Sequence, residues 1–233
     1  MGTAGWSIPS ALSDHFEAEG SGLERYARVF SGAEVNSSFY RRHREATWRR
    51  WHDAVPDDFR FAVKLPKAIS HDLRLHGGEA ELDIFLGDVA PLRAKLGPVL
   101  VQLPPSLPTD TARDTAFFRE LRRRVAGRIV VEPRHRSWAA PYAIAMLSDF
   151  GIDRVYADPQ LDELRAAVKL DGFVYVRLHG APRIYYSAYS ADQIAAYEQM
   201  LSRAATGSWC IFDNTASGAA IGDALELQRL CRR

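Results

Sequence analysis

The chain alternates eight times between short strand-like runs and longer helical patterns, and this alternation constrains its fold more than any other feature. The strand-like runs span residues 3–6, 33–39, 60–66, 98–104, 128–134, 154–158, 173–180 and 209–214. The helical patterns span residues 23–30, 47–55, 81–96, 111–125, 141–151, 191–204 and 218–231, and the link 159–172 offers at most a short helix. Eight such units can close into a barrel. We therefore predict a single α/β domain over residues 1–233, a (β/α)8 TIM-type barrel, with an open doubly wound sheet as the alternative.

Composition narrows the class of protein. Hydrophobic residues make up 47% and charged residues 25% of 233 residues, as is usual for globular proteins. The 30 basic and 29 acidic side chains nearly cancel, which disfavours binding to nucleic acid or membrane by bulk charge alone. Cys210 and Cys231 form no metal-binding or redox pattern, and no run is apolar enough for a signal peptide or a membrane span. We therefore expect a cytoplasmic protein with no membrane contact.

Side chains along a strand alternate between its two faces, so the inward residues of a barrel can be read from the sequence. In FVYVRLHG (173–180), Tyr175, Arg177 and His179 share the face opposite the apolar residues. The same division predicts inward polar residues near the ends of the other strands, namely Asn36, Lys64, Gln102, Glu132, Arg134, Asp158 and Asn214. Active sites of barrels lie at this carboxyl end. The alternative is a buried polar network that only closes the barrel.

Several stretches together resemble the YecE-like family, known as domain of unknown function 72. They are GTAGWS (2–7), AEVNSSFY (33–40), FAVKLPKAISH (61–71), LGPVLVQLPPS (96–106), EPRHRSW (132–138), YADP (156–159), VYVRLHG (174–180) and FDNTASGAA (212–220). The resemblance implies a TIM-like barrel of the broad class that holds metal-dependent sugar isomerases and abasic-site endonucleases. It implies no particular reaction. Where the family pattern more often has two asparagines, this chain has Asp213 before Asn214.

Three basic residues predict an anion site at the carboxyl end. Lys64, Arg134 and Arg177 come from three strands, and guanidinium groups suit phosphate or carboxylate. After the last strand, the loop NTASGAA leads into a helix, so the backbone N–H groups near Ser217 and Gly218 are candidates to hold a phosphate. An ordinary helix cap at Ser217 is an equally good interpretation.

Proton transfer is the second chemistry that the pattern supports. His179, with Glu132 or Asp158 beside it, has the residue types for acid–base catalysis at neutral pH. His71 and Trp138 are further candidates for substrate contact. His71, Glu132, Asp158 and His179 also contain the ligand types for a divalent metal, but no HExxH or similar spacing supports that set, and the cofactor stays open.

The segment RRHREATWRRW (41–51) supports a competing hypothesis. Its five arginines interleave with Trp48 and Trp51, a pattern that suits a nucleic-acid backbone with stacked bases. The simpler interpretation is a helix with a solvated arginine face and two tryptophans in the core. Our leading prediction is an enzyme of hydrolase or lyase type acting on a phosphorylated or other anionic small molecule. The alternative is a nucleic-acid-binding protein, such as a metal-dependent endonuclease relative.

Overall fold

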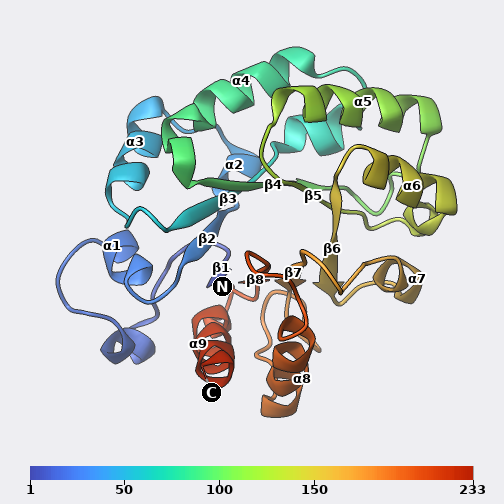
Figure 1. Ribbon diagram of the computed structural model, residues 1–233. Coiled ribbons are helices and arrows are strands. Elements are labelled where there is room, and N and C mark those ends of the chain that lie inside the picture. Colours follow the sequence, from blue (N-terminus) through green and yellow to red (C-terminus); the bar gives the residue numbers. More distant parts are fainter. Residues whose placement is uncertain (233) are drawn as a thin grey trace.

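The computed structural model describes residues 1–232 and shows parallel strands surrounded by helices (Figure 1). Within these residues one eight-stranded sheet is formed by β1 (Gly2–Thr3), β2 (Gly32–Val35), β3 (Arg60–Lys64), β4 (Leu96–Gln102), β5 (Ile129–Glu132), β6 (Asp153–Asp158), β7 (Tyr175–Leu178) and β8 (Trp209–Phe212). Each strand from β2 to β7 pairs in parallel with the next one along the chain, and β8 pairs with β1. The predicted barrel is confirmed; its last predicted residue, 233, lies outside the described residues.

The barrel is nearly closed between β1 and β2. These two strands are joined by an isolated parallel bridge between Ala4 and Glu34. A backbone hydrogen bond of 2.9 Å from the Gly5 N–H to the Glu34 carbonyl continues it. Because β1 has only two residues, this contact replaces a full ladder and places Glu34 beside the start of the chain.

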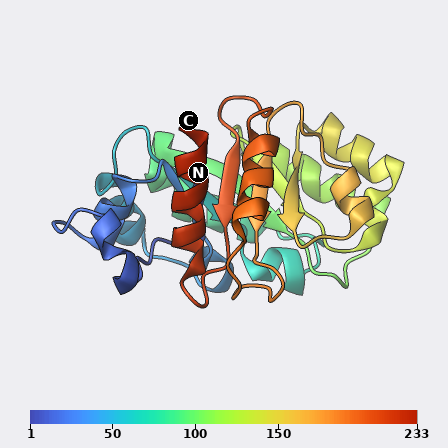
Figure 2. The same ribbon diagram turned by 90° about the horizontal axis from the view of Figure 1, so that it is seen from below.

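The helices form the outer layer, as the side view in Figure 2 also shows for α8 and α9 beside the strands. They are α1 (Gly22–Ala27), α2 (Ser37–Tyr40), α3 (Glu45–Asp53), α4 (Glu79–Val89), α5 (Thr111–Arg124), α6 (Pro141–Asp149), α7 (Asp162–Ala166), α8 (Ala191–Leu201) and α9 (Ala219–Cys231). Short 3-10 or π turns are η1 (Ser10–His15), η2 (Ala68–Asp72), η3 (Ala90–Lys95) and η4 (Arg136–Ala139). Capping boxes at Ser21 and Ser190 fix the starts of α1 and α8.

Two predicted elements have different ends in the structure. The predicted strand 33–39 stops at Val35, and α2 begins two residues later at Ser37. The Ser38 hydroxyl donates hydrogen bonds to the carbonyls of Val35 and Lys64, which favours this early turn. The predicted helix 81–96 instead divides into α4 and η3, and β4 already begins at Leu96.

Apolar side chains form two separate cores on the two faces of the sheet. The inner core consists mainly of aliphatic residues of the barrel interior, including Ala62, Leu100, Val130 and Ile211. The larger outer core lies between the strands and the helices. The alternation predicted from the sequence therefore holds for most strands.

Trp209 fills the end of the barrel where the strands begin. Its ring stacks on Tyr175 with a centroid distance of 5.8 Å. A Cβ atom at Gly32 or Gly97 would lie 3.0 Å from the ring of Trp209, so the two glycines leave room for it. The amino end of the barrel is thus filled by aromatic rings, and the polar residues lie toward the opposite end.

Within the described residues, none of the helices combines the length and apolar character required to cross a bilayer.

Replacing Trp209 by Ala should destabilise the protein by about 3 kcal/mol, because it removes a large ring whose space the two glycines cannot refill. Urea unfolding followed by circular dichroism measures this change. Tyr40→Ala, at a tyrosine that is 77% exposed, is the control and should change stability by no more than about 0.5 kcal/mol. Equal effects of the two substitutions would contradict the packing role of Trp209.

Candidate active site at the carboxyl end of the barrel

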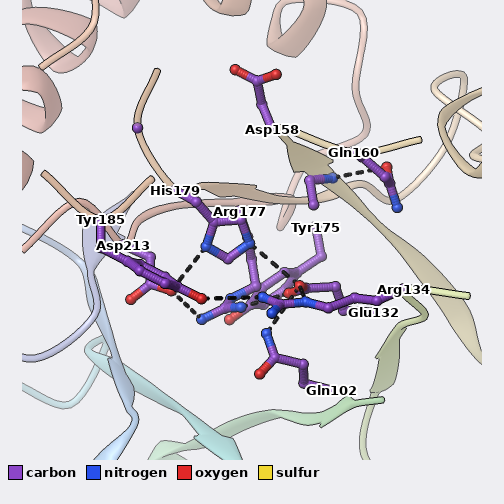
Figure 3. A network of polar contacts seen from close by, with 12 residues as sticks. Gln102, Glu132, Arg134, Asp158, Gln160, Tyr175, Arg177, His179, Tyr185 and Asp213 are labelled. Carbon is purple, nitrogen blue, oxygen red and sulfur yellow. Dashed lines mark hydrogen bonds and ion pairs between the residues drawn. The ribbon is translucent and has the colours of Figure 1, made fainter. Parts of the chain in front are cut away.

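Arg177 lies at the centre of a buried ionic network in the barrel (Figure 3). Its Nε and Nη2 donate to the two carboxylate oxygens of Glu34, at 3.0 and 2.7 Å. Its Nη1 donates to Glu132 Oε2 at 2.5 Å, and Nη2 also donates to Asp213 Oδ2 at 2.9 Å. One fully buried guanidinium therefore binds three carboxylates that come from β2, β5 and the segment after β8.

The cations of the network keep its carboxylates ionised. Burial by itself would raise the pKa of Glu132, but the charges of Arg177, His179 and Arg134 outweigh it and hold the pKa well below its usual range. Burial also acts to raise the pKa of Asp213, and Arg177 and His179 reverse that effect and lower it. Buried charges of this kind are tolerated only when they are paired. Each of the three carboxylates, Glu34, Glu132 and Asp213, accepts a hydrogen bond from Arg177.

His179 lies between two of these carboxylates, with a side chain only 3% exposed. Its Nδ1 forms a 3.0 Å hydrogen bond with Asp213 Oδ2, and its Nε2 lies 3.3 Å from Glu132 Oε1 without hydrogen-bond geometry. Burial lowers the pKa of His179, yet the charge of Glu132 and the hydrogen bond with Asp213 raise it above its ordinary value overall. This favours the protonated ring near neutral pH, with Nε2 as the less constrained nitrogen.

Further side chains hold Glu132 and Asp213 in place. Gln102 Nε2 and Arg134 Nε each donate to Glu132 Oε1 at 2.9 Å. Asn36 Nδ2 donates to Asp213 Oδ1 at 3.1 Å. The predicted inward positions of Asn36, Gln102 and Glu132 are confirmed, and these amides orient carboxylates rather than standing free.

Arg134 is the most accessible cation of the network. Its side chain is 31% exposed, and Nη2 lies 3.4 Å from the Tyr185 hydroxyl. The ring of Tyr185 also meets His179 edge-on, with a centroid distance of 5.7 Å. Tyr185 has a positive φ of 70°, an uncommon backbone conformation for a residue with a side chain, and this conformation is part of the loop that places the ring over His179.

Lys64 and His71 lie beside the network at the end of β3 and in η2. Lys64 Nζ lies 4.1 Å from the ring centre of Phe39. Burial, followed by the charge of Arg177, lowers the pKa of Lys64 to about 8. Burial and the charges of Lys64 and Arg134 lower the pKa of His71 to about 4, so His71 is neutral at physiological pH. Because both cations lower the pKa of His71, Lys64 and Arg134 lie near the same part of the carboxyl end of the barrel, which we call the mouth.

A cavity of about 560 Å³ opens next to the network. Glu132, Arg134 and His179 supply its polar wall, together with Gln160. Its remaining wall is apolar and comes from Pro105, Pro133, Pro159, Leu161, Ile184 and Tyr185, among others. This volume and mixture of walls suit a small molecule with one charged or polar end.

Two predicted inward residues point the other way. Asp158 lies on the helix side of β6, where it accepts a hydrogen bond of 2.5 Å from Tyr197 and lies 3.4 Å from Arg165 Nη2. Figure 3 shows Asp158 pointing away from the network, and the inward position beside it belongs to Ala157. Asn214 is also outward, because Ile211 is an inner-core residue and the alternation therefore brings Asp213 inward.

Asn214 instead has a structural role. Its Nδ2 donates to the Ser187 carbonyl at 2.9 Å and to Asp223 Oδ2 at 2.7 Å. These bonds join the loop before α8 to α9. Asp158 and Asn214 are thus separated from the cavity, and the structure does not place them with the other candidate residues.

Trp138, Ser217 and Gly218 make contacts other than those of the network. Trp138, a residue of η4, is fully buried, with its Nε1 donating to the Leu107 carbonyl at 3.0 Å and its ring packed on Phe118. The Ser217 hydroxyl donates to the Tyr186 carbonyl. Gly218 precedes α9 with a φ of 81°, beside a cavity distinct from the one at His179. The phosphate role of Ser217 and Gly218 stays a prediction.

Four members of the site were not named as candidates from the sequence: Glu34, Tyr175, Tyr185 and Asp213. Glu34 and Asp213 have a readable signal, since each lies on the inward face of its strand or of the strand's continuation. Tyr175 was predicted inward, and its hydroxyl donates to Glu34 Oε2 at 2.8 Å. Tyr185 has no such signal because it lies in a loop.

The arginine-rich segment 41–51 takes the simpler of its two predicted forms. Trp48 is 1% exposed and packs edge-on against Trp51, at a centroid distance of 5.0 Å. Arg42 and Arg49 form ion pairs with Asp88 and Glu45. The buried tryptophan cannot stack on bases, which corrects that part of the competing hypothesis; nucleic-acid binding itself stays a prediction.

A metal site does not form from the four residues proposed for it. Asp158 points out of the barrel, and within residues 1–232 no group of three or more His, Cys, Asp and Glu side chains has a metal-binding arrangement. The carboxylates of Glu132 and Asp213 bind Arg177 and His179 instead.

Comparisons with known proteins agree with the fold. A family model described as protein of unknown function DUF72 matches residues 1–233. The UPF0759 protein YecE, from two strains of Escherichia coli, is 37% identical over 82 residues. This match covers 35% of the present chain and 30% of the length of YecE.

Two solved structures of DUF72 family proteins are also similar. The one from Enterococcus faecalis has a TM-score of 0.81 and 22% identity, covering 100% of this chain and 94% of that protein. The one from Thermotoga maritima has a TM-score of 0.80 and 22% identity, covering 99% of this chain and 98% of that protein. The chain belongs to the DUF72 family, and the structural likeness supports its barrel fold.

Replacing Arg177 by Met should destabilise the protein by about 3–5 kcal/mol at pH 7, because three buried carboxylates lose their shared cation. The loss should shrink as the pH falls toward 5. In the wild type, the lowered pKa of Glu132 and Asp213 stabilises the fold above pH 4 and this stability fades on acidification, whereas in the variant these buried groups take up protons readily. Urea unfolding at both pH values tests this.

The control for this experiment is Arg49→Met, which removes an exposed ion pair on α3. It should cost less than about 1 kcal/mol at either pH. An Arg177 variant as stable as this control at pH 7 would show that the network does not support the barrel.

Proposed function

We propose that this member of the DUF72 family is an enzyme of hydrolase or lyase type that acts on a small anionic molecule at the carboxyl end of the barrel. The observation that carries the proposal is His179, a buried imidazole held between two carboxylates at the wall of a 560 Å³ cavity. A group that can exchange a proton near neutral pH, fixed in orientation beside a cavity, is what acid catalysis requires.

His179 acts as the proton donor in this proposal. The charge of Glu132 and the hydrogen bond with Asp213 offset the effect of burial and favour its protonated form. Nε2 is a buried atom without a hydrogen-bond partner among the described residues, and a substrate would approach it from the cavity that His179 lines. Glu132 has a pKa well below its usual range, so it is a weak base. We therefore propose that Glu132 positions His179. Asp158 lies on the other face of the sheet and takes no part in the chemical steps.

The anion would be held by Arg134 and Lys64. The network contains the carboxylates of Glu34, Glu132 and Asp213, whose charges are matched by Arg177, Arg134 and protonated His179. The ammonium form of Lys64 adds a further positive charge. This excess favours a phosphate or carboxylate at the mouth, with Arg134 as the accessible fork. Arg177 takes no direct part, because its donors already bind three carboxylates.

We also propose that the enzyme works in the cytoplasm. Both of its cysteines, the buried Cys210 and the exposed Cys231, are free thiols. Free thiols are usual in a reducing compartment.

Replacing His179 by Asn should lower kcat by about 10²–10⁴-fold on any substrate found by screening phosphorylated and carboxylated metabolites. In the wild type, kcat/KM should fall as the pH rises through the raised pKa of His179, above pH 6.5, because the proton donor is lost. The residual activity of the variant should lack this fall. A wild-type profile flat from pH 6 to 9, or a variant with full activity, would contradict the role of His179.

Replacing Arg134 by Met should raise KM for the anionic substrate by about tenfold or more and leave kcat less affected, since the lost contact holds the substrate rather than the reacting atoms. Steady-state kinetics measures both constants. Arg136→Met is the matched control, because Arg136 lies two residues further on, is 76% exposed and binds Glu163. Equal kinetics for both variants would remove Arg134 from the anion site.

A further inference from the structure

Lys64 is a buried lysine whose amino group forms no hydrogen bond with the residues that the structure describes. Its residue exposure is 6%, and its Nζ lies over the ring of Phe39, 4.1 Å from the ring centre. Lys95 provides the comparison, because it is also 6% exposed but its Nζ donates to the carbonyls of His52 and Val55, at 2.8 and 2.7 Å. Burial alone therefore does not explain an unbound amine at Lys64.

The place of Lys64 in the fold adds to this contrast. It is the last residue of β3, on the inward face, and at this carboxyl end of the strand it interacts electrostatically with Arg177, Glu132 and His71. Its Nζ is not completely closed to water, so this amine keeps some access to solvent. Lys95, in η3, lies outside the barrel.

We propose that Lys64 is a nucleophile that forms an imine with a carbonyl substrate. This inference rests on the proposed function and specifies it: the substrate would be an aldehyde or ketone that also carries a carboxylate or phosphate, and the reaction would be of lyase type. Arg134 would hold the anionic group. Lys64, whose ammonium form helps to attract that anion, would then lose its proton and attack the carbonyl carbon with its neutral Nζ.

The electrostatic surroundings support a reactive amine. Burial and the charge of Arg177 lower the pKa of Lys64 to about 8, although carboxylates partly oppose them. The charged and titratable groups that face Lys64 are Arg177 from β7, Glu34 from β2, Glu132 from β5, Asp213 after β8 and His71 from η2. A desolvated lysine next to another cation is a known way to obtain a neutral amine near physiological pH.

The step balances without any added oxidant or reductant. The lone pair of Nζ forms a bond to the carbonyl carbon while the C=O π electrons move to the oxygen. That oxygen takes one proton from the nitrogen and a second from an acid, for which His179 is the candidate, and leaves as water. The resulting iminium withdraws electrons from a neighbouring C–C or C–H bond, and its hydrolysis later restores the free amine.

The test uses the whole protein with glyoxylate, an aldehyde that carries a carboxylate, and cyanoborohydride to reduce any imine. The chain has four lysines, Lys64, Lys67, Lys95 and Lys169, so peptide mapping by mass spectrometry separates them. At pH 7.5 a lysine with a pKa of about 8 is roughly one quarter neutral, against roughly 0.1% for an ordinary lysine. We therefore expect Lys64 to be labelled at least about tenfold faster than each of the others.

Acetaldehyde, which lacks the carboxylate, is the second probe. Arg134→Met should slow labelling of Lys64 by glyoxylate about tenfold and leave labelling by acetaldehyde nearly unchanged, because only glyoxylate uses the guanidinium. Lys67, whose Nζ binds Asp72 and whose side chain is 50% exposed, serves as an internal reference in every reaction. Equal slowing with both probes would contradict the assigned place of the anion.

Lys64→Arg distinguishes a covalent role from a role as charge alone. It keeps the cation and cannot form the imine, so kcat should fall at least about 10²-fold with little change in KM if the inference holds. An arginine variant with near wild-type kcat, or a Lys64 labelled no faster than Lys67 and Lys95, would overturn it. Either result would leave the proposed function intact provided that turnover still depended on His179 and Arg134.

Discussion

The buried pairing of Arg177 with three carboxylates is the interaction on which the rest of the site depends. It joins β7 to Glu34 of β2, Glu132 of β5 and Asp213 after β8, across sequence separations of 143, 45 and 36 residues. Each of these charges would be costly in the barrel alone, so the four are stable only as a set. The set also fixes Glu132 and Asp213, the two carboxylates that hold His179. The same residues therefore form the structural network and the candidate active site.

The sequence predicts the layers of this fold well because they follow from simple periodicity. Alternation within strands correctly placed Lys64, Glu132 and Arg177 inside the barrel. It failed for Asp158 and Asn214, where we took the last polar residue of a strand as inward, although the inner-core positions of Ala157 and Ile211 set the opposite parity. Small apolar residues such as Ala157 suit either face, so they give no warning in the sequence.

Pairing is the part that periodicity does not reveal. Three basic residues at the ends of three strands predicted an anion site, and yet the donors of Arg177 are taken by carboxylates of the protein itself. Whether a buried guanidinium is free depends on partners distant in sequence. Two of the partners of Arg177, Glu34 and Asp213, lie close in sequence to Asn36 and Asn214, which the sequence analysis names as inward residues. Periodicity therefore predicts where the polar end of the barrel lies, but not which of its side chains bind one another and which are free to bind a ligand.

The different protonation states of His179 and Lys64 follow from one physical contrast. His179 and Lys64 are buried to a similar degree, and burial lowers the pKa of both. His179 contacts two carboxylates, whose negative charge reverses the effect and raises its pKa. Among residues 1–232 no carboxylate is hydrogen-bonded to Lys64, and the carboxylates that face it only partly offset burial and the charge of Arg177, so its pKa stays lowered. Similar burial thus yields a protonated acid and a partly neutral amine, because the fixed charges are arranged asymmetrically around the carboxyl end of the barrel.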